Sequence, residues 1–169
     1  MNKKHIALAA ILAGLIFLPG AMRAFAQGPA GTPDLIGMLK ATPGVLGVDA
    51  ARTMSGKQVI FAWFENKQAV LTWYYSEGHQ KLMRTMSPGG ASGRKPLADV
   101  PDNSGPILAI ASLTMTDKPQ IAGVSMPVSQ IAIELYAPLP GGLAAGGRFA
   151  PATVKVPGLI ERPVSPHQE

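Results

Sequence analysis

The chain has 169 residues, with 15 Lys and Arg, 10 Asp and Glu, and no Cys. The length suits a single domain, and a composition that is 47% hydrophobic and 15% charged can build a core. The lack of Cys excludes disulfides, a thiolate nucleophile, iron–sulfur clusters and cysteine-based zinc sites.

Residues 1–26 are typical of an export signal. Two lysines precede an uncharged apolar run over 6–18, and Ala24-Phe25-Ala26 supplies small residues where signal peptidase reads the chain. A retained membrane anchor is the alternative, but a spanning helix needs roughly 20 apolar residues, and Pro19 and Gly20 break this run. The sequence therefore predicts a periplasmic or secreted protein with no stable membrane span after processing.

Removal of this segment changes the charge. Three of the 15 basic residues and none of the 10 acidic ones lie in it, so the net charge falls from +5 to +2. The remaining chain has no basic cluster, which argues against a nucleic acid as partner.

The rest of the chain divides into a Gly- and Pro-rich lead-in at 27–33, predicted to be disordered, a single domain at 34–157 and a flexible tail at 158–169. The predicted elements are a helix at 35–40, strands at 45–53 and 57–65, one kinked or two short helices over 67–86, strands at 107–115 and 129–137, and a short edge strand at 154–156. The stretch 87–106 contains four Pro and four Gly, a composition and length typical of a functional cover or a disordered loop.

The strand at 57–65 is apolar on both faces. Its side chains alternate between two sets, Val59, Phe61 and Trp63 on one face and Ile60, Ala62 and Phe64 on the other. An antiparallel strand beside solvent would show one polar face. Helices can cover one side, and a second subunit is the expected cover for the other, which predicts a homodimer.

His79 is the only imidazole in the predicted domain, because His5 lies in the export signal and His167 in the tail. A site with several His ligands is therefore excluded within one subunit, and no metal is expected. Close to Trp73 and Tyr74 on a helix, His79 can act as a general base or orient a ligand. The alternative is a His that only packs or caps the helix.

Glu134 lies inside an apolar strand, where a carboxylate is costly unless it is paired or hydrated. One hypothesis is that it lines a cavity, where a raised pKa would suit a catalytic base. Another is that it pairs with Arg148 or Arg52. The third is that it faces solvent on an edge strand.

Aromatic residues gather near His79 in the sequence and supply candidates for ligand binding. These candidates are Trp63, Trp73, Tyr74 and Tyr136, with Met83 at helical spacing from His79. Such rings can stack on a flat apolar molecule; the alternative is that they are all core. No nucleophile elbow, phosphate-binding loop or dinucleotide fingerprint is present in the chain after the leader.

The order of these motifs resembles one known group of proteins. A Gly-rich turn enters a strand at 43–48, a strand at 59–65 contains Trp63, a helix at 67–73 ends in Trp73, and 76–79 form a Ser-x-x-His motif. Over about residues 34–84 the chain is similar to the antibiotic-biosynthesis-monooxygenase-like group of dimeric α+β barrels.

The resemblance implies a ferredoxin-like α+β fold, with an antiparallel sheet, helices on one face, and two subunits that pair into a barrel. The group includes cofactor-independent oxygenases and haem-degrading enzymes. Trp73 falls where the haem-degrading members place an aromatic, but their haem-binding His corresponds to a position near Met83, which disfavours haem. The group usually begins with a strand that this chain lacks, and we expect 107–115 to take its place.

We therefore expect an exported α+β protein that binds a small apolar or aromatic ligand as a homodimer. A cofactor-independent monooxygenase would use His79 or Glu134 as the base that deprotonates an electron-rich substrate. The alternatives are a non-catalytic structural or interaction protein, and a haem-binding protein that uses His79 or Met83.

Overall fold

A computed structural model describes residues 34–86 and 95–164. The predicted export signal, the lead-in at 27–33, residues 87–94 of the long loop and residues 165–169 of the tail lie outside the described residues. Within the described part, no helix is both long and apolar enough to cross a bilayer.

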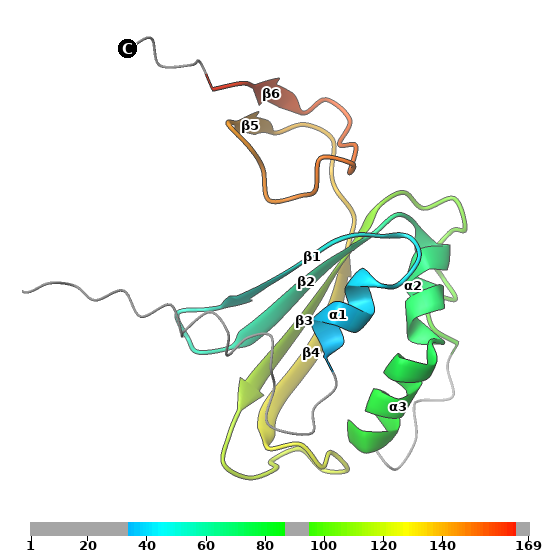
Figure 1. Ribbon diagram of the computed structural model, residues 1–169, viewed down its shortest axis with the longest axis vertical. Helices are drawn as coiled ribbons and strands as arrows, with labels where there is room; N and C mark the ends of the chain where they lie inside the picture. Colours follow the sequence, from blue (N-terminus) through cyan, green and yellow to red (C-terminus); the bar gives the residue numbers. More distant parts are fainter. Residues whose placement is uncertain (1–33, 87–94, 165–169) are drawn as a thin grey trace, which may run out of the picture.

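The chain forms a four-stranded antiparallel sheet with helices on one face (Figure 1). In chain order the elements are α1 (Leu35–Lys40), β1 (Val45–Arg52), β2 (Gln58–Phe64), α2 (Lys67–Tyr74), α3 (Glu77–Met86), β3 (Ile107–Met115), β4 (Val128–Tyr136), β5 (Leu143–Ala145) and β6 (Ile160–Arg162). The strand order in the sheet is β1-β2-β3-β4, so β3 occupies an inner position beside β2. The α+β class is confirmed, and the arrangement is compatible with a ferredoxin-like fold.

Side-chain caps start the three helices. Asp34 Oδ1 accepts a hydrogen bond from Gly37 N–H (2.9 Å), and Asn66 Oδ1 accepts one from Ala69 N–H (3.0 Å). Ser76 Oγ accepts from His79 N–H (3.2 Å), so the chain restarts as a new helix after Tyr74. Of the two predicted arrangements for 67–86, two consecutive helices is the one observed.

The main core lies between the helices and the sheet. Phe64, at 1% exposure, and Ala62 project from β2 toward the helices, where Leu39 of α1 and Val70 of α2 pack on them. Ile107 of β3 pairs directly with Phe64 and is also buried. The even-numbered apolar residues of β2 thus supply the helix-facing set, as the alternation predicts.

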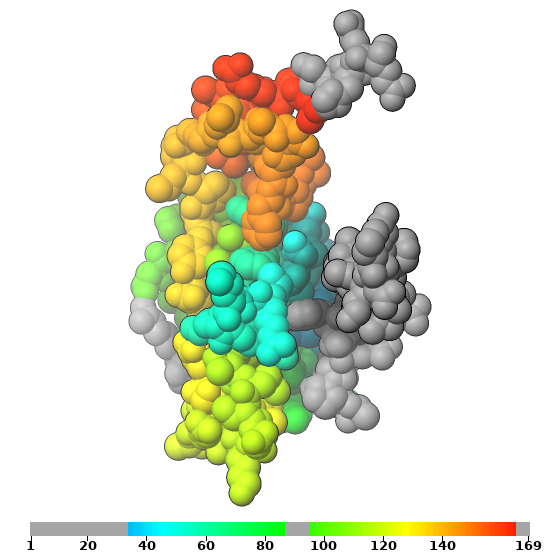
Figure 2. Space-filling model, turned by 90° about the vertical axis from the view of Figure 1, so that its left-hand side faces the viewer, coloured from blue at the N-terminus to red at the C-terminus, as the bar shows by residue number. Residues whose placement is uncertain are grey.

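The opposite face of the sheet is partly covered by the same chain. Phe149 meets Phe61 edge-on, with ring centroids 4.9 Å apart, and a Cβ on Gly47 would lie 2.5 Å from Pro151 Cγ. Figure 2 shows this face, with the orange C-terminal segment lying over its upper part. A second subunit was the expected cover for this face, whereas the residues after β4 supply part of it.

The C-terminal segment differs from the predicted pattern. β5 and β6 pair in parallel as a separate two-stranded sheet, and β6 falls within 158–169, where a flexible tail was expected. The short strand predicted at 154–156 is not formed. Instead, Val154 is fully buried in a turn, and its backbone N–H donates a hydrogen bond to the Pro151 carbonyl. Three exposed residues in β6 give no alternation from which a strand could be recognised.

Candidate functional site

His79 lies in the first turn of α3 and is only 8% exposed. Its position follows from two local signals, the Tyr75 turn that ends α2 and the Ser76 cap that begins α3. A His at this point turns back toward the carbonyl end of α2. The unpaired carbonyls of that helix end are natural acceptors for it.

The imidazole is held in one tautomer. Nδ1 lies 2.8 Å from the Tyr74 carbonyl oxygen, and because that oxygen can only accept, Nδ1 carries the proton. The Gln80 side-chain amide donates to the same oxygen (2.5 Å). Nε2 is therefore the nitrogen with the free electron pair, and none of the described residues donates a hydrogen bond to it.

Burial lowers the pKa of His79, and the hydrogen bond to the Tyr74 carbonyl opposes this shift. The desolvation effect is the larger of the two. The ring is therefore neutral near pH 7, which is the form in which Nε2 can accept a proton.

Two aromatic rings flank the imidazole. The ring centroids of Trp73 and Tyr74 each lie 5.2 Å from that of His79, tilted by 57° and 43°. Met83 lies one helical turn further along α3 and is half-buried. The structure thus brings together four of the predicted site residues, here called the His79 cluster: His79, Trp73, Tyr74 and Met83.

The other predicted site residues lie on the opposite face of the sheet. Trp63 pairs with Leu108, and Glu134 pairs with Ile110. These positions alternate with Phe64 and with the other residues that face the helices. Trp63, Glu134 and Tyr136 are therefore separated from the His79 cluster by the sheet itself, and the seven residues do not form one pocket.

Glu134 is exposed on the edge strand β4, which is the third of the arrangements considered for it. A hydrogen bond to its carboxylate raises the pKa of the Tyr136 hydroxyl, two residues along the same face. Arg148 is not its partner, because the Arg148 guanidinium contacts Glu161 (3.2 Å) and the Ala152 carbonyl (2.9 Å). The carboxylate is exposed to solvent and does not line a buried cavity.

Trp63 is packed as core. Its side chain is 8% exposed, and among the described residues its indole Nε1 is buried without a hydrogen-bond acceptor. A buried donor of this kind costs about 1–3 kcal/mol. The ring is enclosed by protein, on the face of the sheet opposite the His79 cluster.

The described part of the long loop contacts the start of α2 and the main core. Lys67 Nζ, at the start of α2, donates to the Val100 carbonyl (2.6 Å) and contacts Asp102 Oδ1 (2.7 Å). Leu97, with a positive φ of 55°, packs against the main core. Residues 95–106 are thus fastened to the other end of α2, away from Tyr74.

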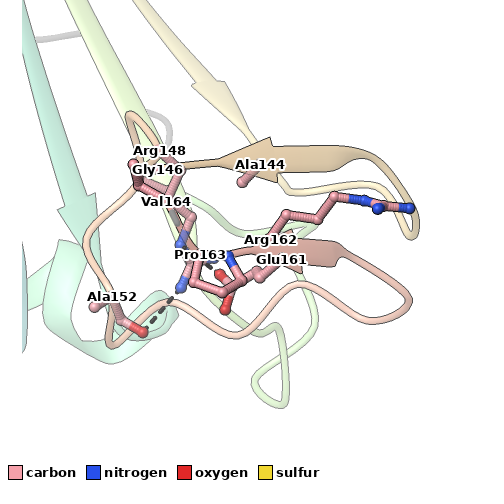
Figure 3. Close-up of a pocket in the computed structure, with 10 residues that line it drawn as sticks. Ala144, Gly146, Arg148, Ala152, Glu161, Arg162, Pro163 and Val164 are labelled. Carbon is pink, nitrogen blue, oxygen red and sulfur yellow. Dashed lines mark hydrogen bonds and ion pairs between the residues drawn. The ribbon is translucent and has the colours of Figure 1, made fainter. Parts of the chain in front are cut away.

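A hollow of about 540 Å³ lies in the C-terminal segment, beside β5 and β6 (Figure 3). Arg148 and Glu161 form an ion pair within it, whereas the Arg162 side chain points away from them. This arrangement could not be predicted from the sequence, because residues 148 and 161 come together through the β5–β6 pairing. The hollow is open to solvent, and the Arg148 charge is already balanced.

Among the described residues, no group of three His, Asp or Glu side chains could hold a metal ion. Comparison with family models, with curated proteins and with solved structures gave no match to this chain. The geometry of the His79 cluster is therefore the main evidence for function.

Proposed function

We propose that this is an exported α+β protein that binds a small apolar or aromatic molecule at the His79 cluster. The proposal rests on the hydrogen bond from His79 Nδ1 to the Tyr74 carbonyl, which fixes Nε2 as a neutral acceptor beside two aromatic rings. The rings supply apolar surface for stacking. Nε2 can then accept a proton from an O–H or an acidic C–H of the ligand.

We further propose cofactor-independent oxygenation as the reaction. His79 Nε2 would remove a proton from an activated methylene of an electron-rich substrate, and O₂ would oxidise the resulting carbanion. The methylene becomes a ketone and the second oxygen atom leaves as water, so the substrate supplies all the electrons. The lowered pKa of His79 supports this role, because the base is unprotonated at neutral pH.

The resemblance to the antibiotic-biosynthesis-monooxygenase-like group belongs to the same proposal. Two features support it: the helices cover one face of the antiparallel sheet, and β3 lies between β2 and β4. The second feature is consistent with β3 taking the place that the first strand occupies in that group.

A thermal-shift screen with hydroxylated polycyclic aromatic compounds tests the site. We expect some compounds to raise the Tm of the wild-type chain, and His79→Asn to abolish that shift. Asn keeps an N–H donor near the position of Nδ1 but lacks Nε2, so the contact with the Tyr74 carbonyl survives while the acceptor is lost. O₂ consumption with the same compounds tests the oxygenation step.

Glu134→Gln is the matched control, since Glu134 lies on the other face of the sheet. It should keep the full ligand-induced shift. Equal shifts in wild type and His79→Asn, or none in wild type, would contradict the proposed site. A Soret band that appears on addition of haem and is lost in His79→Asn would replace it with the haem-binding alternative.

A non-catalytic interaction protein is the second candidate function. It is favoured by the distribution of exposed apolar side chains, most of which follow residue 132. The members from this part of the chain are Ile133, Leu135, Tyr136, Leu139, Leu143, Phe149, Ile160 and Val164. Large exposed apolar side chains favour protein contacts where they gather on one surface.

A further inference from the structure

The outer edge of β4 has no partner strand in the described sheet (Figure 1). Its carbonyl at Val128 already accepts a hydrogen bond from Gln120 N–H (3.1 Å). Beyond a register shift at its start, β4 pairs regularly with β3 from Gln130 to Tyr136. Because the pairing is regular over this stretch, its free side can accept another strand.

The other edge of the same sheet is protected. β1 has a register shift between Val45 and Gly47, and Pro151 packs against Gly47. The Asp49 side chain accepts a hydrogen bond from the backbone N–H of Ala50 (2.7 Å). Bulges, prolines and charged side chains are the devices by which proteins prevent edge pairing.

The corresponding stretch of β4 has few of these devices. From Gln130 to Tyr136 it contains no Pro, no Gly and one charge, that of Glu134. Ile133 is 60% exposed and Leu135 is 41% exposed. A long, exposed and apolar edge strand is a template for another strand.

We infer that two copies of this chain pair antiparallel through the β4 edges, with the two-fold axis at Ile133. Ile133 is the middle residue of Gln130–Tyr136, so this register uses the whole regular stretch. The two sheets then become one continuous sheet. A two-fold contact of this kind uses both β4 edges and leaves only the two protected β1 edges at the ends of the joined sheet.

The side chains fit this register on both faces. On one face, Ile133 lies opposite its own copy and Ile131 lies opposite Leu135, so every cross-strand pair is apolar. On the other face, Glu134 lies opposite Ala132 and no carboxylate meets another. A register centred on Glu134 would place two carboxylates face to face, which is unfavourable.

This inference places the homodimer contact at the edge of the sheet, and not over its face as the sequence led us to expect, and it does not depend on ligand binding at His79. The test uses the full chain, which has no Cys of its own. We expect Ile133→Cys to give a disulfide-linked dimer under mild oxidation, because directly opposed Cα atoms in an antiparallel pair lie about 4.5–5.5 Å apart.

Two controls fix the register. Leu135→Cys alone should stay monomeric on a denaturing gel, because its copy lies about four residues, or about 13 Å, further along the strand. Mixed with Ile131→Cys, it should cross-link. Met54→Cys, fully exposed in the β1–β2 turn, measures random collision.

Ile133→Lys should convert the dimer to a monomer in sedimentation experiments without changing the circular dichroism spectrum. Cross-linking of Ile133→Cys that does not exceed that of Met54→Cys would overturn the inference, as would a wild-type chain that sediments as a monomer at tens of micromolar. Either result leaves the thermal-shift test of His79 unaffected, so the two proposals fail separately.

Discussion

The two ends of the described fold differ in the exposure of their large apolar side chains. Residues 35–86, together with β3, bury theirs between the helices and the sheet, where Phe64 is 1% exposed and Leu39 is 5% exposed. From β4 onward, large apolar side chains such as Ile133 and Leu143 are more than half exposed. The first part therefore contains most of the core, whereas the second part buries Val128 and Val154 but presents most of the exposed apolar surface.

Phe64→Ala should produce the largest loss of stability, about 3–5 kcal/mol, because it empties a fully buried position. Leu143→Ala, on the exposed side of the comparison, should change the free energy of unfolding by less than about 0.5 kcal/mol. Urea denaturation followed by circular dichroism measures both values. Similar losses for the two variants would refute the division between the two parts.

Asn66→Ala should cost about 1 kcal/mol, because it removes the side-chain acceptor for Ala69 N–H at the start of α2. Asn66→Asp keeps an acceptor and should stay close to wild type. The same urea experiment applies. A loss equal in both variants would show that the residue acts through something other than its cap.

Phe149→Ala tests the aromatic contact between Phe149 of the C-terminal segment and Phe61 of the sheet. We expect a loss of about 0.5–1.5 kcal/mol, the range for an aromatic pair. Leu139→Ala is the control, since Leu139 is 82% exposed. Faster proteolysis of the segment after β4 in Phe149→Ala alone would locate the effect; equal rates in both variants would argue against this contact.

The smallest expected effect is the change in the free energy of unfolding with pH that His79 causes, because this change is absent at neutral pH. The pKa of folded His79 lies below its unfolded value of about 6.5, so the unfolded chain takes up the proton first on acidification. Stability should therefore hold above about pH 6.5 and fall as the pH drops from there through the folded pKa. In His79→Asn that part of the decline should be absent; an identical pH profile in both chains would count against a buried, neutral imidazole.

The N-terminal half of the fold could be predicted from the sequence because local signals there agree with tertiary packing. Asp34, Asn66 and Ser76 cap the helices as their sequence context indicates, and the alternation in β2 separates two apolar faces. The prediction that both faces of β2 are covered is also confirmed, because β2 buries side chains on each face. The sequence could not show that the C-terminal segment covers the second face, because Phe149 and Phe61 are far apart in the chain.

The candidate site was predictable only where its residues are neighbours in the chain. Trp73, Tyr74 and His79 come together because α3 begins soon after α2 ends. Whether Trp63, Glu134 and Tyr136 lie near His79 depends on the face of the sheet that each of them occupies. That face is set by how the strands lie relative to the helices, which the local sequence does not specify. The exposure of Glu134 follows from the edge position of β4, which no local pattern specifies.

The two tryptophans of the chain lie on opposite sides of the sheet. Trp63 is enclosed and has no hydrogen-bond acceptor within 34–86 and 95–164, so its fluorescence emission should lie at short wavelength and report on the docking of the C-terminal segment. Trp73, beside the His79 ring, should be quenched when that imidazole gains a proton. Variants that keep one indole each would thus give separate optical signals for the two layers of the same small protein.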